Sequence, residues 1–151
     1  MSRFNPKDAR FEARVRASFA RQAAMATLGI EIIGVNAGEV ELRMPYAAGY
    51  AQQHGFIHAG IITTALDTAC GYAAFSLMPD DAAVLTVEFK ANLIAPARGE
   101  FFLFRAQVVK PGRTITFCDA QAFGSEEGKE KLVANMSGTF MALFDRNGIA
   151  H

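Results

Sequence analysis

The sequence lacks the features that would place it in several large classes of protein. Its 15 Lys and Arg residues equal its 15 Asp and Glu residues, so nothing indicates a basic surface for nucleic acid or an acidic disordered tail. It has only two cysteines, Cys70 and Cys118, and their spacing is not that of a zinc site or a redox pair. We therefore expect no metal site and no nucleic-acid partner, and we interpret both cysteines as small core residues.

Targeting signals, internal repeats and low-complexity segments are also missing. The amino terminus does not show the charged, apolar and small-residue order of a secretory signal peptide, which favours a cytoplasmic location. Residues 1–25 are rich in arginine, but Asp8 and Glu12 count against an organelle transit peptide. No glycine-rich phosphate loop is visible, so no nucleotide cofactor is expected.

The amino-terminal segment nevertheless has helical features. Asn5 and Pro6 resemble the cap and first turn of a helix, and the apolar residues that follow recur at helical spacing. The sequence therefore predicts a helical extension over residues 1–26. The chain has 151 residues, 51% of them hydrophobic, which suits one compact domain; we place that domain at residues 27–146 and a short tail at 147–151.

The longest apolar segment runs from Ala59 to Met78 and contains a single charged residue, Asp67. As a helix it would be about 30 Å long, which is also the length of a membrane span. Asp67 and the threonines near it argue instead for a helix buried in protein, so we expect no membrane partner. Burying a carboxylate costs free energy unless a nearby group binds it or it takes part in the function. Asp67 is therefore the first candidate for a functional residue.

Six other segments have the composition and periodicity of strands. The turn residues between the last four segments predict an antiparallel meander of three consecutive hairpins. In residues 82–94 an apolar row is expected to face the core, and a polar row is expected on the other side. The apolar row is Val87, Phe89, Ala91 and Leu93, and the polar row is Thr86, Glu88, Lys90 and Asn92. The six predicted strands are 29–35, 39–44, 82–94, 100–110, 113–123 and 131–144.

This order of elements predicts an α+β fold. A helix that is apolar on all sides is buried on all sides only if the sheet curves strongly around it. We therefore predict a hotdog fold, in which a curved antiparallel sheet wraps one long central helix, with an extra N-terminal helix. A ferredoxin-like sandwich would need a second amphipathic helix between the later strands, and none is visible.

The entrance to the central helix carries a family resemblance. The segment Gly55–Gly60, followed by Asp67 nine residues after His58, resembles the His-Gly-Gly…Asp pattern of PaaI-like hotdog acyl-CoA thioesterases. The resemblance extends over residues 29–144. Ala59 stands where the pattern has its first glycine, and it keeps the backbone amide.

The resemblance implies roles for several residues. Asp67 would act as a general base on water or as a nucleophile, and the sequence leaves both open. The amides of Ala59 and Gly60 would bind the carbonyl oxygen at the N-terminus of the helix. On a helical wheel Asp67 is expected to share its face with threonines, with Cys70 and with Gly71, whose lack of a side chain would leave room for water or an acyl chain.

Three further residues match the family pattern. His58 would orient the loop or interact with the departing thiolate. Gln52, where many relatives have asparagine, would help to hold the water or the carbonyl, and Gln53 could take its place. Thr86 would steady the attacking water.

The resemblance also implies a partner and a substrate. Relatives build each active site across a dimer interface, so we expect a homodimer or homotetramer that takes acyl-CoA, with coenzyme A as part of the substrate and no separate cofactor. The cations that we would test against the coenzyme A phosphates are Lys90, Arg98 and Arg113.

Three functions fit these observations to different degrees. The leading hypothesis is an acyl-CoA thioesterase that releases a free acid and coenzyme A. The alternative from another class is a module that binds acyl-CoA without cleaving it. An enoyl-CoA hydratase on the same fold would need a closely placed Asp and His, and Asp67 lies too far along the helix for that.

Overall fold

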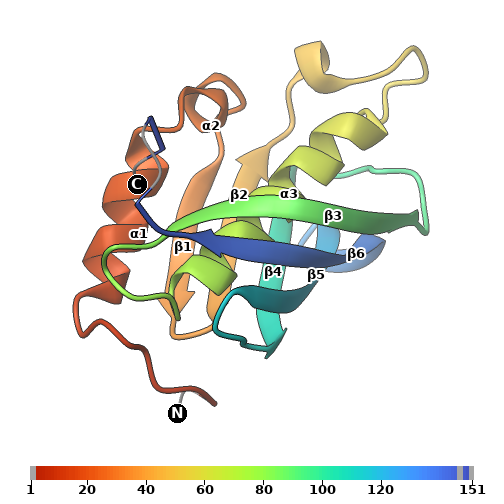
Figure 1. Cartoon of the computed structure of the whole chain (residues 1–151). Helices are drawn as coiled ribbons and strands as arrows, with labels where there is room; N and C mark the ends of the chain where they lie inside the picture. Colours follow the sequence, from red (N-terminus) through yellow and green to blue (C-terminus); the bar gives the residue numbers. More distant parts are fainter. Residues whose placement is uncertain (1–2, 146–147, 150–151) are drawn as a thin grey trace.

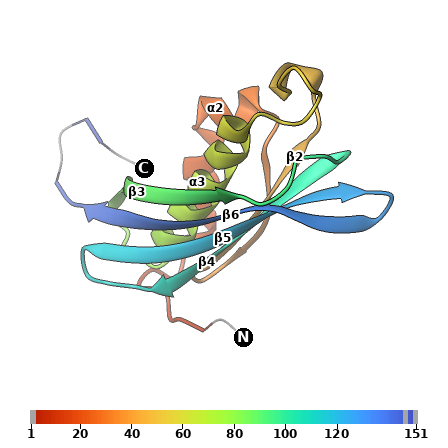
Figure 2. The same ribbon diagram turned by 90° about the vertical axis from the view of Figure 1, so that its right-hand side faces the viewer.

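The structure, a computed structural model that describes residues 3–145 and 148–149, is a six-stranded antiparallel sheet curved around one long helix (Figures 1 and 2). This is the hotdog fold that the sequence predicts. Residues 1–2 of the predicted extension, residue 146 of the predicted domain and residues 147, 150 and 151 of the predicted tail lie outside the described residues. The strands are β1 Glu31–Asn36, β2 Glu39–Pro45, β3 Ala83–Leu93, β4 Phe101–Lys110, β5 Ile115–Glu126 and β6 Lys129–Leu143.

The strands lie in the order β1-β2-β4-β5-β6-β3, and Figure 2 shows β3, β6, β5 and β4 side by side. The predicted meander is therefore wrong in its first hairpin, because β3 pairs with β6 and β4 pairs with β2. Residues 94–100 join β3 to β4. Because β6 and β5 lie between these two strands in the sheet, this connection crosses both of them and is not a tight turn. Periodicity predicts which face a residue occupies, but it does not predict which strands are neighbours.

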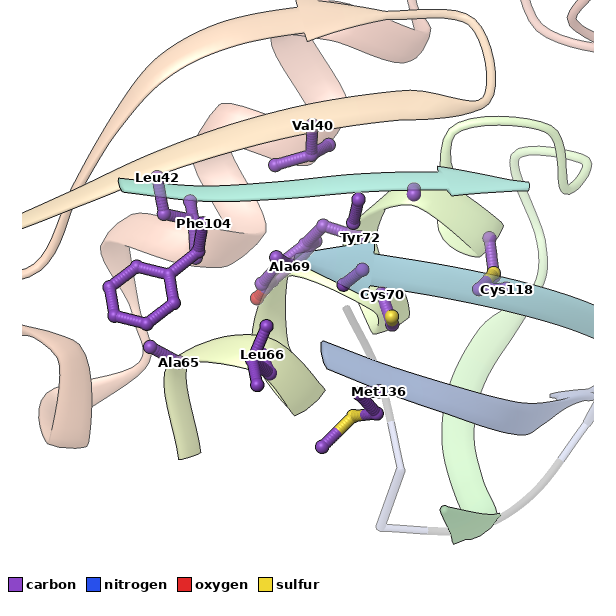
Figure 3. Packing of buried hydrophobic residues seen from close by; sticks show 14 of the residues in the cluster. Val40, Leu42, Ala65, Leu66, Ala69, Cys70, Tyr72, Phe104, Cys118 and Met136 are labelled. Carbon is purple, nitrogen blue, oxygen red and sulfur yellow. The ribbon is translucent and has the colours of Figure 1, made fainter. Parts of the chain in front are cut away.

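Helix α3, Ala59–Phe75, supplies the centre of the core. It packs against β2, β3, β4, β5 and β6, and Figure 3 shows its side chains meeting those of β2, β4, β5 and β6. It ends three residues before the predicted end, where the Ser76 hydroxyl donates to the Ala73 carbonyl and accepts from the Gly38 N–H. No helix in residues 3–145 and 148–149 combines the length and apolarity needed to cross a bilayer.

Both cysteines are buried and free, as predicted. Burial raises the pKa of the Cys70 thiol well above its usual value and raises the pKa of Cys118 to about 12. Cys70 follows Asp67 by three residues, which places the two side chains about 60° apart around the helix axis. Cys70 points into the core near Cys118 (Figure 3), whereas Asp67 is half-buried.

One stripe of α3 is left open by the sheet and by the N-terminal helices. It consists of Gly60, Thr64, Asp67 and Gly71, which follow one another at helical spacing; Gly60 is exposed and the other three are half-buried. Asp67 is therefore less enclosed than the sequence predicts. The stripe is the part of the central helix that a substrate or a second chain can reach.

The N-terminal extension forms two helices, α1 (Phe11–Ala20) and α2 (Ala23–Thr27), beside β1 (Figure 1). The predicted start at Asn5-Pro6 is wrong. The Asp8 carboxylate accepts hydrogen bonds from the Arg10 N–H at 2.9 Å and from the Arg14 guanidinium at 3.0 Å, and α1 begins only after this turn. One buried residue of each helix, Val15 and Met25, belongs to the core.

Strand β3 lies at the edge of the sheet and contains a bulge between Thr86 and Glu88. Thr86 lies opposite Phe140 and Phe89 lies opposite Gly138, so both face the helix side of the sheet. The predicted grouping of Thr86 with Glu88 is therefore wrong, because the extra residue shifts the alternation. The predicted burial of the apolar row is also wrong, since Phe89 is 43% exposed and Leu93 is 60% exposed.

Candidate active site

The N-terminus of α3 is shaped by His58, which caps the helix. Its backbone is extended, and its Nδ1 atom accepts a hydrogen bond from the Gly60 N–H at 2.9 Å. The Gly60 amide, one of the two predicted oxyanion donors, is thus already engaged. The Ala59 N–H has no acceptor among the described residues. Since unpaired amides and the helix dipole at this end attract negative charge, Ala59 is the better placed donor.

A cavity of about 520 Å³ adjoins this helix start, within the size range of small-molecule sites. Gln52, Gln53 and His58 line its polar side. Its apolar walls come from the loop, α3, β6 and the end of β3, and they include Leu93 and Ile94. No charged residue of the described chain lines it, so the cavity suits a neutral, apolar group.

Asp67 and Thr86 meet on the open stripe of α3. The Thr86 hydroxyl donates to the Asp67 Oδ1 atom at 2.8 Å, and the other carboxylate oxygen accepts no hydrogen bond from the described residues. Burial raises the pKa of Asp67, and the hydrogen bond from Thr86 partly opposes that rise. A carboxylate with a raised pKa and one free oxygen is a stronger proton acceptor than an ordinary aspartate.

These two arrangements are separate within one chain. Ala59 and Asp67 are eight residues apart on one helix, which is about 12 Å along its axis, and neither Asp67 nor Thr86 lines the cavity. Groups that act on the same carbonyl must approach to about 3–3.5 Å. A single chain therefore holds two halves of the predicted site that do not meet.

The polar loop residues are partly engaged with the loop itself. The Gln52 Oε1 atom accepts a hydrogen bond from the His54 N–H, and the Gln52 N–H donates to the Phe56 carbonyl at 2.8 Å. Gln52 lines the cavity, as does the exposed Gln53. The predicted role of Gln52 toward water or the carbonyl stays a prediction.

The three candidate cations lie in different places. The Arg98 guanidinium lies 4.7 Å from the centre of the Phe56 ring, beside the cavity, and makes no ion pair with the described residues. Lys90 is on the outer face of β3. Arg113 lies just before β5. The first residue of β5, Ile115, is aligned across the sheet with the start of β3, so Arg113 lies at the same end of the sheet as Thr86. No three His, Cys, Asp or Glu side chains of the described residues could hold a metal ion together.

Sequence reasoning missed the cavity walls at the end of β3. Leu93 and Ile94 are 60% and 51% exposed, although the alternation assigned Leu93 to the buried row. Two consecutive large aliphatic residues at the end of an alternating strand cannot both face the core. That pair was the signal in the sequence for an apolar surface at this end of the strand.

Comparisons with known proteins identify relatives with the same fold. A model of the thioesterase superfamily matches residues 54–131, just over half of the chain. The crystal structure of a thioesterase family protein from Silicibacter pomeroyi is 58% identical and superposes with a TM-score of 0.88, over 89% of this chain and 98% of that one. The superfamily match begins at His54, so it leaves out the N-terminal helices.

Two more distant relatives are similar over shorter or less identical regions. The PaaI protein of the E. coli phenylacetic acid degradation operon has a TM-score of 0.81 and 22% identity, with coverage of 91% and 96% of the two chains, and it shares the fold. An inferred esterase from Halobacterium salinarum is 33% identical over 96 residues. That match covers 60% of this chain and 63% of the archaeal protein, which is less than two thirds of its length.

Proposed function

Because the chain belongs to the thioesterase superfamily, we propose that it is an acyl-CoA thioesterase, which hydrolyses an acyl-CoA to a free acid and coenzyme A. Its relatives support thioester hydrolysis as the class of reaction, and the acyl-CoA substrate is our more specific proposal. The observation that carries it is the free Ala59 N–H at a helix N-terminus, beside a cavity without charged walls.

The chemistry assigns one step to each half of the site. The Ala59 N–H binds the thioester oxygen as it becomes negative during attack on the carbonyl carbon. Asp67 either takes a proton from the attacking water or attacks the carbon itself, which gives an anhydride that water then hydrolyses. In both cases the carbon–sulfur bond breaks, and the coenzyme A thiolate leaves and takes up a proton.

We further propose that two copies of the chain complete each site, in a homodimer or a larger assembly. Strand β3 is an open edge of eleven residues with exposed apolar side chains, and such edges favour pairing with another strand. Antiparallel pairing of two β3 strands about a twofold axis brings the Thr86 end of one copy beside the Leu93 end of the other. Asp67 and Thr86 of one chain then approach Ala59 of its partner.

The same arrangement distributes the candidate phosphate-binding residues. Arg98 lies at the cavity end of the chain and Arg113 lies at the Thr86 end. A twofold pairing therefore brings Arg98 of one copy to the same composite site as Arg113 of the other. Stacking on Phe56 holds the Arg98 guanidinium in place, which favours contact with a phosphate. Lys90, on the outer face, is the weakest of the three candidates.

The decisive experiment mixes two inactive variants. Asp67→Ala removes the carboxylate, and Ala59→Pro removes the amide hydrogen. If the halves come from different chains, every mixed dimer has one intact site, so random mixing restores about a quarter of the wild-type rate of thiol release. Mixtures that stay as inactive as the separate variants, although exchange of subunits is demonstrated by mass spectrometry, would reject the shared site.

The substrate is tested by thiol release over a panel of short, medium, long and aromatic acyl-CoAs. We expect turnover of neutral, apolar acyl groups and little turnover of acyl groups that end in a second carboxylate, because no cation lines the cavity. Tight binding of the whole panel without thiol release would favour the non-catalytic binding module instead.

A further inference from the structure

We propose that Tyr50 is a positioning residue, which fastens the loop of the oxyanion donor to the N-terminal helices. The inference rests on the proposed function of Ala59, but it concerns a residue outside the region that the thioesterase superfamily matches, residues 54–131. It assigns the extension a role in the geometry of the site, in addition to its role in covering the core.

The loop between β2 and α3 is held by two hydrogen bonds at its end next to α3. The His58 N–H donates to the Tyr50 carbonyl at 2.9 Å, and the Ile57 N–H donates to the Ala97 carbonyl at 3.1 Å. The next amide along the chain after His58 is the free one of Ala59. A shift of the Tyr50 backbone therefore passes through one hydrogen bond to the residue that precedes the oxyanion donor.

The side chain of Tyr50 connects this loop to the extension. Its hydroxyl donates to the carbonyl of Thr27, the last residue of α2, at 3.1 Å, and its ring packs against the core. The Ala97 carbonyl anchors the loop from the side of the β3–β4 connection, and the Thr27 carbonyl anchors it from the side of α2. Two anchors from different directions restrict the loop more than either anchor alone.

The extension is itself fastened to the other end of α3. The Arg14 guanidinium donates to the Phe75 and Met78 carbonyls at 3.3 and 2.7 Å, and the Ser18 and Tyr72 hydroxyls lie 3.1 Å apart. The extension is thus bonded twice near the C-terminus of α3, through Arg14 and through Ser18, and, through Tyr50, to the loop before the N-terminus of α3. It spans the central helix and connects the loop to a fixed frame.

The chain offers a matched pair of variants. Tyr50→Phe and Tyr72→Phe each delete one hydroxyl whose hydrogen bond to the extension is 3.1 Å long. Only Tyr50 belongs to the loop. Tyr72 is 4% exposed and Tyr50 is half-buried, so the loss at Tyr72 is expected to lower the melting temperature more.

We expect Tyr50→Phe to lower kcat about tenfold while KM changes less than about threefold, since the donor is misplaced in the transition state and binding of the substrate is retained. Tyr72→Phe should keep the wild-type kcat despite its lower melting temperature. Equal kcat values for Tyr50→Phe and the wild type, or losses of kcat that follow the melting temperature in both variants, would overturn the proposal.

Amide hydrogen exchange tests the same coupling without activity. In Tyr50→Phe the segment 50–60 should exchange faster than in the wild type, while the segment 68–78 is unchanged; Tyr72→Phe should give the reverse. If the wild-type protein releases no thiol from any acyl-CoA, the proposed function fails and the exchange result still decides the role of Tyr50. Unchanged exchange in the loop of Tyr50→Phe would reject that role.

Discussion

The two halves of the candidate site differ in the part of the polypeptide that they use. At the start of α3 the proposed donor is a backbone amide, and its position is set by the His58 cap and by the loop. Eight residues further on, the proposed reactive group is the side chain of Asp67, held by the hydroxyl of Thr86. Most substitutions keep the backbone amide of a residue, which explains how Ala59 can stand where the family pattern has glycine. Any substitution of Asp67, in contrast, removes its carboxylate or changes its position.

The largest effect should come from the side-chain half. Asp67→Asn keeps the shape and removes the base or nucleophile, so thiol release should fall by about 10²–10⁴-fold, with the fold and assembly retained. The matched control is Asp119→Asn, the same change at an exposed position on β5, which should leave the rate unchanged. Full turnover by Asp67→Asn would mean that this half carries no chemistry.

Among the natural amino acids, only proline removes the backbone N–H of residue 59. Ala59→Pro should lower kcat by about 10²–10³-fold, the usual effect of losing one oxyanion donor. Proline is tolerated at the first position of a helix, and the His58 backbone, with φ −58° and ψ 135°, is compatible with a following proline. The melting temperature should therefore change little. Ala59→Gly keeps the amide and should retain activity, and a fully active Ala59→Pro would place the oxyanion donor elsewhere.

At His58 the side chain holds the backbone in place, because its Nδ1 atom accepts a hydrogen bond from the Gly60 N–H. His58→Ala should destabilise the protein by about 1 kcal/mol through loss of the helix cap and should lower kcat about tenfold through the displaced helix start. His58→Asn provides a different capping side chain and should restore most of both, as measured by thermal unfolding and steady-state kinetics. If asparagine restores stability but not kcat, His58 takes part in the chemistry as well.

The smallest predicted effect is a shift in pH dependence. Because burial raises the pKa of Asp67, activity should fall as the pH is lowered through that raised value. Thr86→Val removes the bond that lowers the pKa, so the acidic limb should move to higher pH while the plateau falls only several-fold. A limb that moves to lower pH, or does not move, would contradict the assignment of that limb to Asp67.

The same shift has a consequence for folding. The folded protein binds the Asp67 proton more tightly than the unfolded chain does. This contribution to stability is therefore fully present below the ordinary aspartate value of 3.8, which the unfolded chain keeps, and it is lost as the pH rises through the higher pKa of the folded state. Asp67→Asn should therefore be at least as stable as the wild type near neutral pH.

The sequence predicted the parts of the fold that depend on periodicity. The alternating strands, the apolar helix and its solitary carboxylate all follow from residues within one segment. The position of β3 next to β6 depends on a long-range choice that a local pattern does not contain. The extra residue at Val87 had no distinctive signal either, and it reversed the predicted face of Thr86. In the site, Asp67 and Thr86 were predicted individually, while their 2.8 Å hydrogen bond required the tertiary structure.

The open edge of β3 also bears on how the protein is made. A newly synthesised copy presents an unpaired strand whose Phe89 and Leu93 side chains are exposed, and such a strand is a template for aggregation until it pairs as in the proposed dimer. In the proposed dimer, a substitution that weakens the pairing of β3 should therefore lower the solubility of the protein. The bulge at Val87 interrupts the ladder near the middle of this edge, and it limits the run of regular backbone that a wrong partner could join.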